Sequence, residues 1–149
     1  AILLRNLCMK NKGVYIKLGQ HLCQLDYILP TEYCNILRAL LDKNPVSSYE
    51  QVCAVIQEEL GKFPEVPFRS FDSTPLASAS LAQVHTAIGH DGVKYAVKIQ
   101  HHYLRDDAKG DLVAINWAIN CVGKLFEGFR YGWLLREMNR NLPQELDFL

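Results

Sequence analysis

The sequence of 149 residues lacks a charge excess of either sign, since 16 Lys and Arg residues balance 16 Asp and Glu residues. Proteins that bind nucleic acid need a basic surface to meet the phosphates, so this balance argues against nucleic acid as the main partner. Basic side chains do precede the first acidic residue, Asp26, at Arg5, Lys10, Lys12 and Lys17. A solvated helix face accounts for them more simply than a patch that binds a lipid surface.

The sequence also lacks paired cysteines and long apolar runs. Its 5 cysteines include no C-x-x-C pair and no N-x-[ST] acceptor occurs, which argues against a disulfide framework or a zinc ribbon and favours a reducing compartment. The most apolar window, residues 112–123, is well short of the ~20 residues that a membrane-spanning helix needs. The chain starts without methionine and stops within a running pattern, so we expect it to be a piece of a longer protein.

Helical periodicity dominates the first sixty residues. Apolar residues recur at spacings of four and three over residues 4–29, which predicts one long amphipathic helix. The next signals are Pro30 at the start of a second helix, Ser47 with a capping box to Glu50 at the start of a third, and Gly61 at its end. We therefore expect a helical layer, assigned to a first domain of residues 1–62.

Residues 63–149, the second expected domain, begin with a change of pattern at Pro64 and Pro67. Asp91-Gly92 is a strong turn signal and predicts a hairpin. The expected elements are strands over 66–71, 82–88 and 93–100, helices over 104–126 and 133–141, and a last helix that opens at Pro143. Within the last strand, Tyr95, Val97 and Ile99 are expected on one face, with Ala96, Lys98 and Gln100 on the other.

The tetrapeptide Lys17-Leu18-Gly19-Gln20 breaks the rules of the helix around it. Glycine within a helix costs roughly 1 kcal/mol relative to alanine, and a lysine on the buried side needs a partner. Such a local conflict is typical of a functional site. We therefore treat these residues as a candidate site.

A second candidate lies in the hairpin. Lys98 is expected on a central strand, two residues from the small Ala96, and this is the arrangement by which kinases hold nucleotide phosphates and adenine. The segment 75–85 stands where a kinase has its glycine-rich loop, but it is built from alanine and serine. Taken separately, the lysine could be an exposed strand residue and the segment a turn of small residues.

With these motifs in view, the chain resembles the UbiB family of aarF-domain-containing atypical kinases over almost its whole length. It is most similar to the mitochondrial branches outside the ubiquinone-biosynthesis group. The family's signatures occur in order: K-x-G-Q at Lys17, Gly19 and Gln20, an alanine-rich loop at Ala77, Ser78, Ala79 and Ser80, the sequence Gln83-Val84-His85, the strand lysine Lys98, and E-x-D at Glu145 and Asp147.

The resemblance implies an α+β fold, namely the N-lobe of a protein-kinase-like fold with a small antiparallel sheet. This N-lobe would carry an N-terminal helical extension and an inserted helical pair, and the C-lobe would be absent. It implies that Ala77 to Ser80 line the phosphate side of a nucleotide site, that Ala96 borders adenine and that Lys98 contacts phosphates. The family commonly has three alanines before the serine, so Ser78 is expected to add a hydroxyl there. The K-x-G-Q residues would form a lid over the pocket, with Lys17 paired to Glu145 and Asp147.

The resemblance further implies that the intact protein binds ATP with Mg²⁺ and acts as an atypical kinase or ATPase in mitochondrial lipid or membrane homeostasis. A small or lipid-associated substrate is favoured over a protein, since the added helix would cover the protein-docking cleft. The chain holds no complete set of catalytic residues. It also holds no metal site, since His90, His101 and His102 make a poor group of metal ligands. The alternative is a pseudokinase scaffold whose helices bind a partner or a membrane surface.

Overall fold

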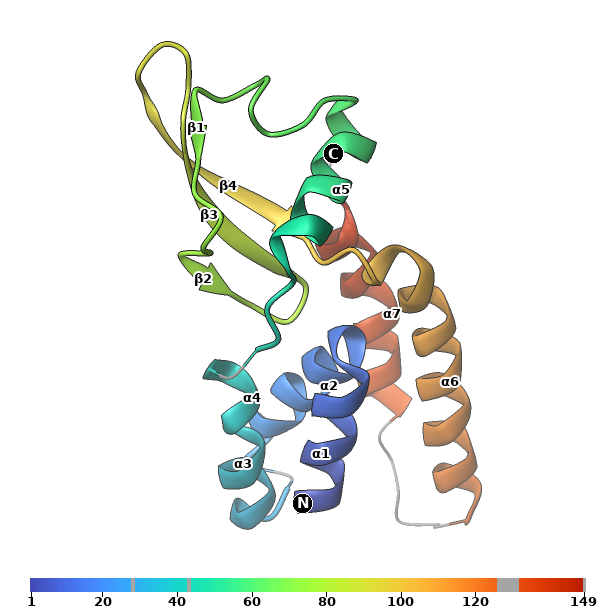
Figure 1. Ribbon diagram of the computed structural model, residues 1–149. Coiled ribbons are helices and arrows are strands. Elements are labelled where there is room, and N and C mark those ends of the chain that lie inside the picture. The colour runs from blue at the N-terminus through green and yellow to red at the C-terminus, as the bar shows by residue number, and fades with distance from the viewer. Residues whose placement is uncertain (28, 43, 126–131, 149) are drawn as a thin grey trace. The chain divides into compact units, whose positions relative to one another are not determined.

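The computed structural model describes residues 1–27, 29–42, 44–125 and 132–148. The chain divides into two compact units, Ala1–Leu104 and Arg105–Leu149. The first unit combines short helices with a small antiparallel sheet, and the second is helical (Figure 1). The expected α+β class is confirmed. The domain boundary that we placed between residues 62 and 63 falls inside the first unit.

The first unit begins with four short helices: α1 (Ile2–Asn11), α2 (Gly13–Cys23), α3 (Thr31–Leu37) and α4 (Ala39–Asp42). The prediction of one long helix over residues 4–29 is wrong, because the chain breaks at Lys12, where φ is 61°. Gly13 follows with φ of 42°, and a Cβ atom there would come within 2.7 Å of the Leu104 side chain. The sequence signals neither the positive φ at a lysine nor this close approach.

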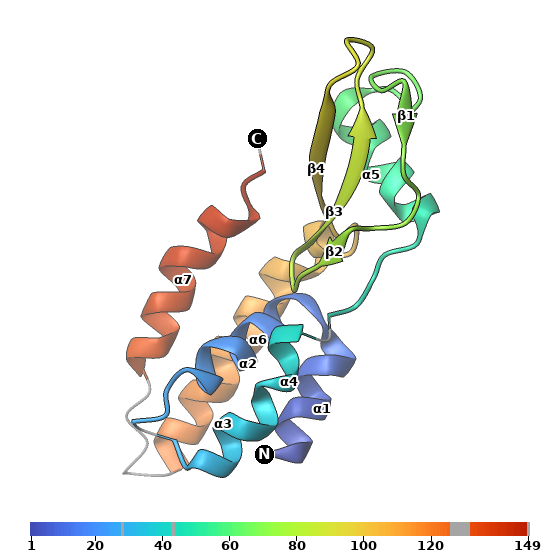
Figure 2. The same cartoon turned by 90° about the vertical axis from the view of Figure 1, so that its left-hand side faces the viewer.

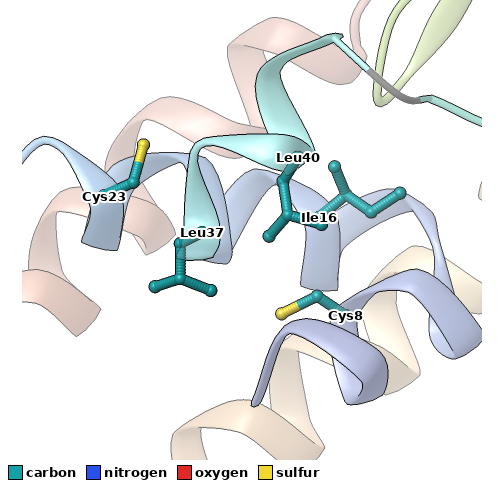
Figure 3. Close-up of a cluster of buried hydrophobic side chains, with 5 residues drawn as sticks. All are labelled: Cys8, Ile16, Cys23, Leu37 and Leu40. Atoms are coloured by element: carbon teal, nitrogen blue, oxygen red, sulfur yellow. The ribbon is translucent and has the colours of Figure 1, made fainter. Parts of the chain in front are cut away.

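Buried side chains of α1 to α4 form one hydrophobic cluster, drawn in Figure 3: Cys8, Ile16, Cys23, Leu37 and Leu40. Gly19 of α2 lies against this cluster. A Cβ atom at Gly19 would overlap the side chain of Leu40 and would lie 3.2 Å from the sulfur of Cys8. The absence of a side chain at Gly19 therefore permits close packing between these helices.

A fifth helix, α5 (Tyr49–Leu60), is delimited by its caps. Its capping box is formed by Ser48 and Gln51, one residue later than the expected pair of Ser47 and Glu50. The predicted stop at Gly61 is confirmed, because Gly61 adopts the left-handed conformation with φ of 66°. The shift by one residue leaves Ser47 outside the helix, where its side chain is available for other contacts.

The sheet contains β1 (Ser70–Phe71), β2 (Ala77–Ser78), β3 (Ala82–Ile88) and β4 (Lys94–Gln100), all paired antiparallel. Figure 2 shows β3 in the middle, with β4 along one edge and the short strands β1 and β2 along the other. The central strand is therefore β3, and Lys98 lies on β4, for which the described residues supply no second neighbour. The strand predicted over 66–71 is reduced to β1, since residues 63–68 form turns around two prolines.

The alternation of β3 and β4 creates two faces, as predicted for β4. We call the face with Gln83, His85, Val97 and Ile99 the covered face, because α5 packs on it through Val52, Val55 and Ile56. We call the face with Val84, Thr86, Ala96 and Lys98 the open face, since Ala96 and Lys98 are exposed and the other two are half-buried. The covered face holds the buried polar residues Gln83 and His85, and the open face holds the exposed Ala96 and Lys98.

The second unit is the expected helical pair, α6 (Leu104–Leu125) and α7 (Gly132–Leu146). The two helices are joined by reciprocal bonds between the side-chain amides of Asn116 and Asn139, at 2.9 and 3.1 Å. Pro143 does not open a further helix, because it lies within α7, between the buried Leu142 and the last turn. No helix in the described ranges is both long and apolar enough to cross a membrane.

Candidate functional site

The open face brings two nucleotide-site candidates, Ala77 of β2 and Lys98 of β4, into one row across β3. Ala77 of β2 pairs with Val84 of β3, which in turn pairs with Lys98 of β4. The next row holds Thr86 and Ala96. Directly paired residues share one face of a sheet, so a cation, a small residue and apolar side chains lie side by side at the surface.

The alanine-rich loop turns back on itself beside this row. The amide of Ala79 donates a hydrogen bond of 2.8 Å to the carbonyl of Ala82 and closes a tight turn. Ser78 pairs with Gln83 and therefore belongs to the covered side, where its hydroxyl donates a 2.6 Å hydrogen bond to the Pro45 carbonyl. The extra hydroxyl expected at the phosphate site is thus engaged with the chain before α5.

The K-x-G-Q motif contacts this loop through Gln20. Its amide nitrogen donates to the carbonyl of Leu40 at 2.9 Å, and its amide oxygen accepts from the hydroxyl of Ser80 at 3.3 Å. Ser80 is buried, with 5% of its surface exposed. Two motifs that stand 60 residues apart in the sequence are therefore in direct contact.

A buried chain of hydrogen bonds lies beneath the loop. The amide of Gln83 accepts from the backbone of Ser47 at 2.8 Å, donates to its carbonyl at 3.2 Å, and contacts His85 Nε2 at 2.9 Å. His85 Nδ1 lies 2.7 Å from the carbonyl of Asp72, which fixes it as the protonated nitrogen, so Nε2 accepts from Gln83.

The same chain of hydrogen bonds continues through His101. Its Nε2 lies 3.0 Å from the carbonyl of Ala79, and its Nδ1 lies 2.7 Å from the hydroxyl of Ser47. A neutral ring with the proton on Nε2 satisfies both contacts, since the serine hydroxyl then donates to Nδ1. Burial lowers the pKa of His101, and the positive charge of Lys12 lowers it further, against the opposing effect of the Ala79 carbonyl.

Aromatic stacking connects His101 to the N-terminal helices. The ring of Tyr103 stacks on His101 with a centroid separation of 5.5 Å and an interplanar angle of 7°. Lys12, at the junction of α1 and α2, places its ammonium group 5.6 Å from the centre of the tyrosine ring. The alanine-rich loop is thus linked to the N-terminal helices by two routes, one through Gln20 and the other through His101.

The remaining motif residues lie in different units. Lys17 is half-buried on α2 of the first unit, whereas Glu145 is half-buried in the last turn of α7 and Asp147 follows that helix. The predicted pairing of Lys17 with these carboxylates stays a prediction. In the described part of the chain, no group of three or more His, Cys, Asp or Glu side chains could hold a metal ion.

A model of the ABC1 atypical kinase-like domain matches residues 39–149. The chain belongs to this family. A putative ABC1 protein of Arabidopsis thaliana is 52% identical over 147 residues, which cover 98% of this chain and 27% of that protein. The AarF domain-containing protein kinase 1 of Mus musculus is 48% identical over 143 residues, with coverages of 96% and 27%. The UbiB/aarF resemblance is thereby confirmed.

A solved structure is also similar to this chain. A Mycobacterium tuberculosis protein, solved as a complex with erythromycin, matches with a TM-score of 0.57 and 29% sequence identity, over 98% of this chain and 37% of that one. The chain spans about a quarter of the length of the curated relatives named above. The activity of the whole protein is therefore a matter for proposal.

Sequence reasoning missed Ser47 and His101 as parts of the site. The sequence indicates a helix cap at Ser47, and it offers His101 only as a metal ligand beside His102. The available signal was the spacing of Gln83 and His85, which lie two residues apart and therefore share one face of the strand expected over 82–88. Buried polar side chains need partners, so two such residues on one face predict further polar residues nearby, although not which ones.

Proposed function

We propose that this chain forms the nucleotide-binding part of an atypical kinase or ATPase that uses ATP with Mg²⁺. The observation that carries the proposal is the row of Ala77, Val84 and Lys98 on the open face, beside a loop anchored from below. Ala96, one row further, leaves space for a flat adenine ring. The exposed Lys98 ammonium supplies the charge that phosphates require.

The residues present fit a nucleotide better than they fit a metal ion. Small side chains at Ala77, Ala79 and Ala96 let a ligand approach the backbone, and Lys98 provides one cation. When bound, ATP would supply a transferable phosphoryl group; in that site Lys98 would hold the phosphates and Ala96 would border the base. Because the described residues offer no group of metal ligands, we assign no role to Mg²⁺ in this part of the chain.

Lys17 and Gln20 are proposed to act as a lid that restricts what reaches the nucleotide. The contact between Gln20 and Ser80 supports this role, because it holds α2 against the loop. We expect this arrangement to disfavour docking of a protein substrate and to favour a small or lipid-associated one. A role in mitochondrial lipid or membrane homeostasis completes the proposal, and it rests on the family alone.

A membrane-surface partner is supported by α1. Ile2, Leu3 and Leu7 are exposed on this helix, which also carries the basic residues Arg5 and Lys10. Apolar and basic side chains on one short helix suit the surface of an anionic bilayer. The same feature would serve the alternative function, a pseudokinase scaffold that binds through its helices.

A thermal shift assay of the full-length protein with Mg-ATP tests the proposal. A ligand at 100 times its dissociation constant stabilises the folded state by about 2.7 kcal/mol, so millimolar Mg-ATP should raise the melting temperature measurably. Lys98→Met should remove most of this increase without lowering the melting temperature of the nucleotide-free protein. A wild-type protein that is not stabilised by millimolar Mg-ATP would favour the scaffold.

The lid has its own test. Lys17→Ala should leave the fold intact and should change the affinity or selectivity for ATP over other nucleotides, measured by titration with fluorescent analogues. Lys10→Ala on α1 is a matched control, because Lys10 is exposed and belongs to neither the K-x-G-Q motif nor the alanine-rich loop. If Lys17→Ala and Lys10→Ala bind every nucleotide like the wild type, the lid role is wrong.

A further inference from the structure

The alanine-rich loop has few side-chain atoms with which to hold its own shape. Ala77 and Ala79 end at Cβ, and the hydroxyl of Ser78 is directed to Pro45. Alanine and serine also avoid the positive φ angles by which glycine-rich loops adapt to a ligand. The hydroxyls of Ser78 and Ser80 attach the loop to Pro45 and Gln20, and the remaining constraint comes from residues that bond the loop's backbone.

His101 holds that backbone at two points. Its side-chain Nε2–H donates to the carbonyl of Ala79 at 3.0 Å, and its own amide donates to the carbonyl of Leu81 at 3.0 Å. The ring is almost completely buried, with 1% of its surface exposed, and Ser47 orients it by donating to Nδ1. A buried ring with both nitrogens bonded has one orientation, so its donor is aimed at one loop atom.

We propose that His101, oriented by Ser47, is a positioning residue that sets the conformation of the alanine-rich loop for nucleotide binding. The inference rests on the proposed function, since it assigns a means of control to the same site. It also explains why polar residues occupy the covered face: Gln83 fixes Ser47, Ser47 fixes His101, and His101 fixes the loop. Tyr103 stacks on His101, and Lys12 lies over the tyrosine ring. These contacts extend the control to the junction of α1 and α2.

Two substitutions of His101 separate the hydrogen bond made by its Nε2 from the one made by its Nδ1. A glutamine amide nitrogen can take the place of Nε2 and donate to Ala79, whereas a shorter asparagine can accept from Ser47 but cannot reach the loop. Both variants lose the aromatic ring and its stacking on Tyr103, so both should be destabilised to a similar extent. We expect His101→Asn to bind Mg-ATP about five- to tenfold more weakly than His101→Gln in the full-length protein.

The neighbouring serines provide a matched pair. Ser47→Ala removes the hydroxyl that orients His101 and should weaken Mg-ATP binding several-fold. Ser48→Ala removes the side chain that caps α5, through Ser48 Oγ and the amide of Gln51. It should lower the melting temperature without changing the affinity. A purely structural role for Ser47 predicts that the two variants change affinity alike, and this result would overturn the proposal.

Amide hydrogen exchange of the nucleotide-free protein gives a second readout that does not depend on the proposed function. The amides of residues 79–82 should exchange faster in His101→Asn than in His101→Gln, while those of α5 should exchange alike. If the wild-type protein binds no nucleotide, the proposed function fails and this exchange still decides whether His101 holds the loop. Equal exchange at residues 79–82 in the two variants would overturn the inference.

Discussion

On the covered face of the sheet, Gln83 and His85 are almost completely buried, whereas on the open face Val84 and Thr86 are only half-buried beside the exposed Ala96 and Lys98. Within β3 the more polar pair therefore lies inside and the less polar pair lies nearer to solvent, which reverses the usual distribution for this one strand. A protein tolerates buried polar groups when they are hydrogen-bonded, as Gln83 and His85 are. The covered face thus holds residues that shape the site, and the open face holds residues that would touch the ligand.

The largest expected effect comes from the covered face. Gln83→Leu keeps a side chain of similar size but leaves the amide and carbonyl of Ser47 and Nε2 of His85 without their bonds to Gln83. Each buried polar group left unsatisfied costs about 1–3 kcal/mol, so the free energy of unfolding should fall by about 3 kcal/mol or more. Urea denaturation of the full-length protein measures this loss.

Lys98→Met on the open face is the counterpart. Exposed substitutions usually change stability by about 0.5 kcal/mol or less, so the urea midpoint should stay near that of the wild type while Mg-ATP binding is lost. Equal destabilisation by Gln83→Leu and Lys98→Met would contradict the division of tasks between the two faces.

A smaller effect distinguishes two glycines that both lie within helices. Gly19→Ala gains roughly 1 kcal/mol of helix propensity, but overpacking against Leu40 and Cys8 costs about 1–3 kcal/mol, so we expect a net loss of stability. Gly110→Ala in α6 meets no atom within 4 Å and should raise stability by up to about 1 kcal/mol. Melting temperatures should therefore move in opposite directions, and a stabilising Gly19→Ala would show that α2 is not closely packed.

The smallest effect concerns pH. Because burial lowers the pKa of His101 below its usual 6.5, the unfolded chain takes up a proton at a higher pH than the folded chain does. The contribution of this group to stability is therefore complete above pH 6.5 and decreases as the pH falls below it. The groups that face the ring are Ser47, Tyr103, Lys12 and the Ala79 carbonyl.

Urea midpoints measured at about pH 7.5 and about pH 5.5 test this dependence. The decrease in stability at the lower pH should be smaller in His101→Gln than in the wild type, because glutamine does not titrate. A control, His90→Gln, replaces an exposed histidine and should leave the difference between the two pH values unchanged. An unchanged pH dependence in His101→Gln would show that the ring is not kept neutral by its surroundings.

Much of the fold could be predicted from local patterns in the sequence. The period of two separated the faces of β4, Asp91-Gly92 marked the turn before it, and Gly61 ended α5. These features depend on a few adjacent residues. The break at Lys12 could not be predicted, because a lysine carries no signal for a positive φ and the need arises from packing near Leu104.

The motifs of the candidate site could be predicted from the sequence, but the hydrogen bonds that hold them in place could not. Lys98, Ala96 and the alanine-rich loop stand out from the strand pattern and the small residues, and the resemblance assigns their roles. The register then places Ala77, Val84 and Lys98 in one row. The contact of Ser47 with His101 joins residues 54 positions apart, and that of Gln20 with Ser80 joins residues 60 apart. Such pairings follow from the assembled fold, which no local pattern encodes.

Amide hydrogen exchange of the full-length protein, with and without saturating Mg-ATP, tests most directly that the open face binds a nucleotide. We predict slower exchange at residues 77–82 and 94–100 when Mg-ATP is present, and no such protection in Lys98→Met. Protection elsewhere in the protein, with these two segments unchanged, would contradict the assignment of the open face.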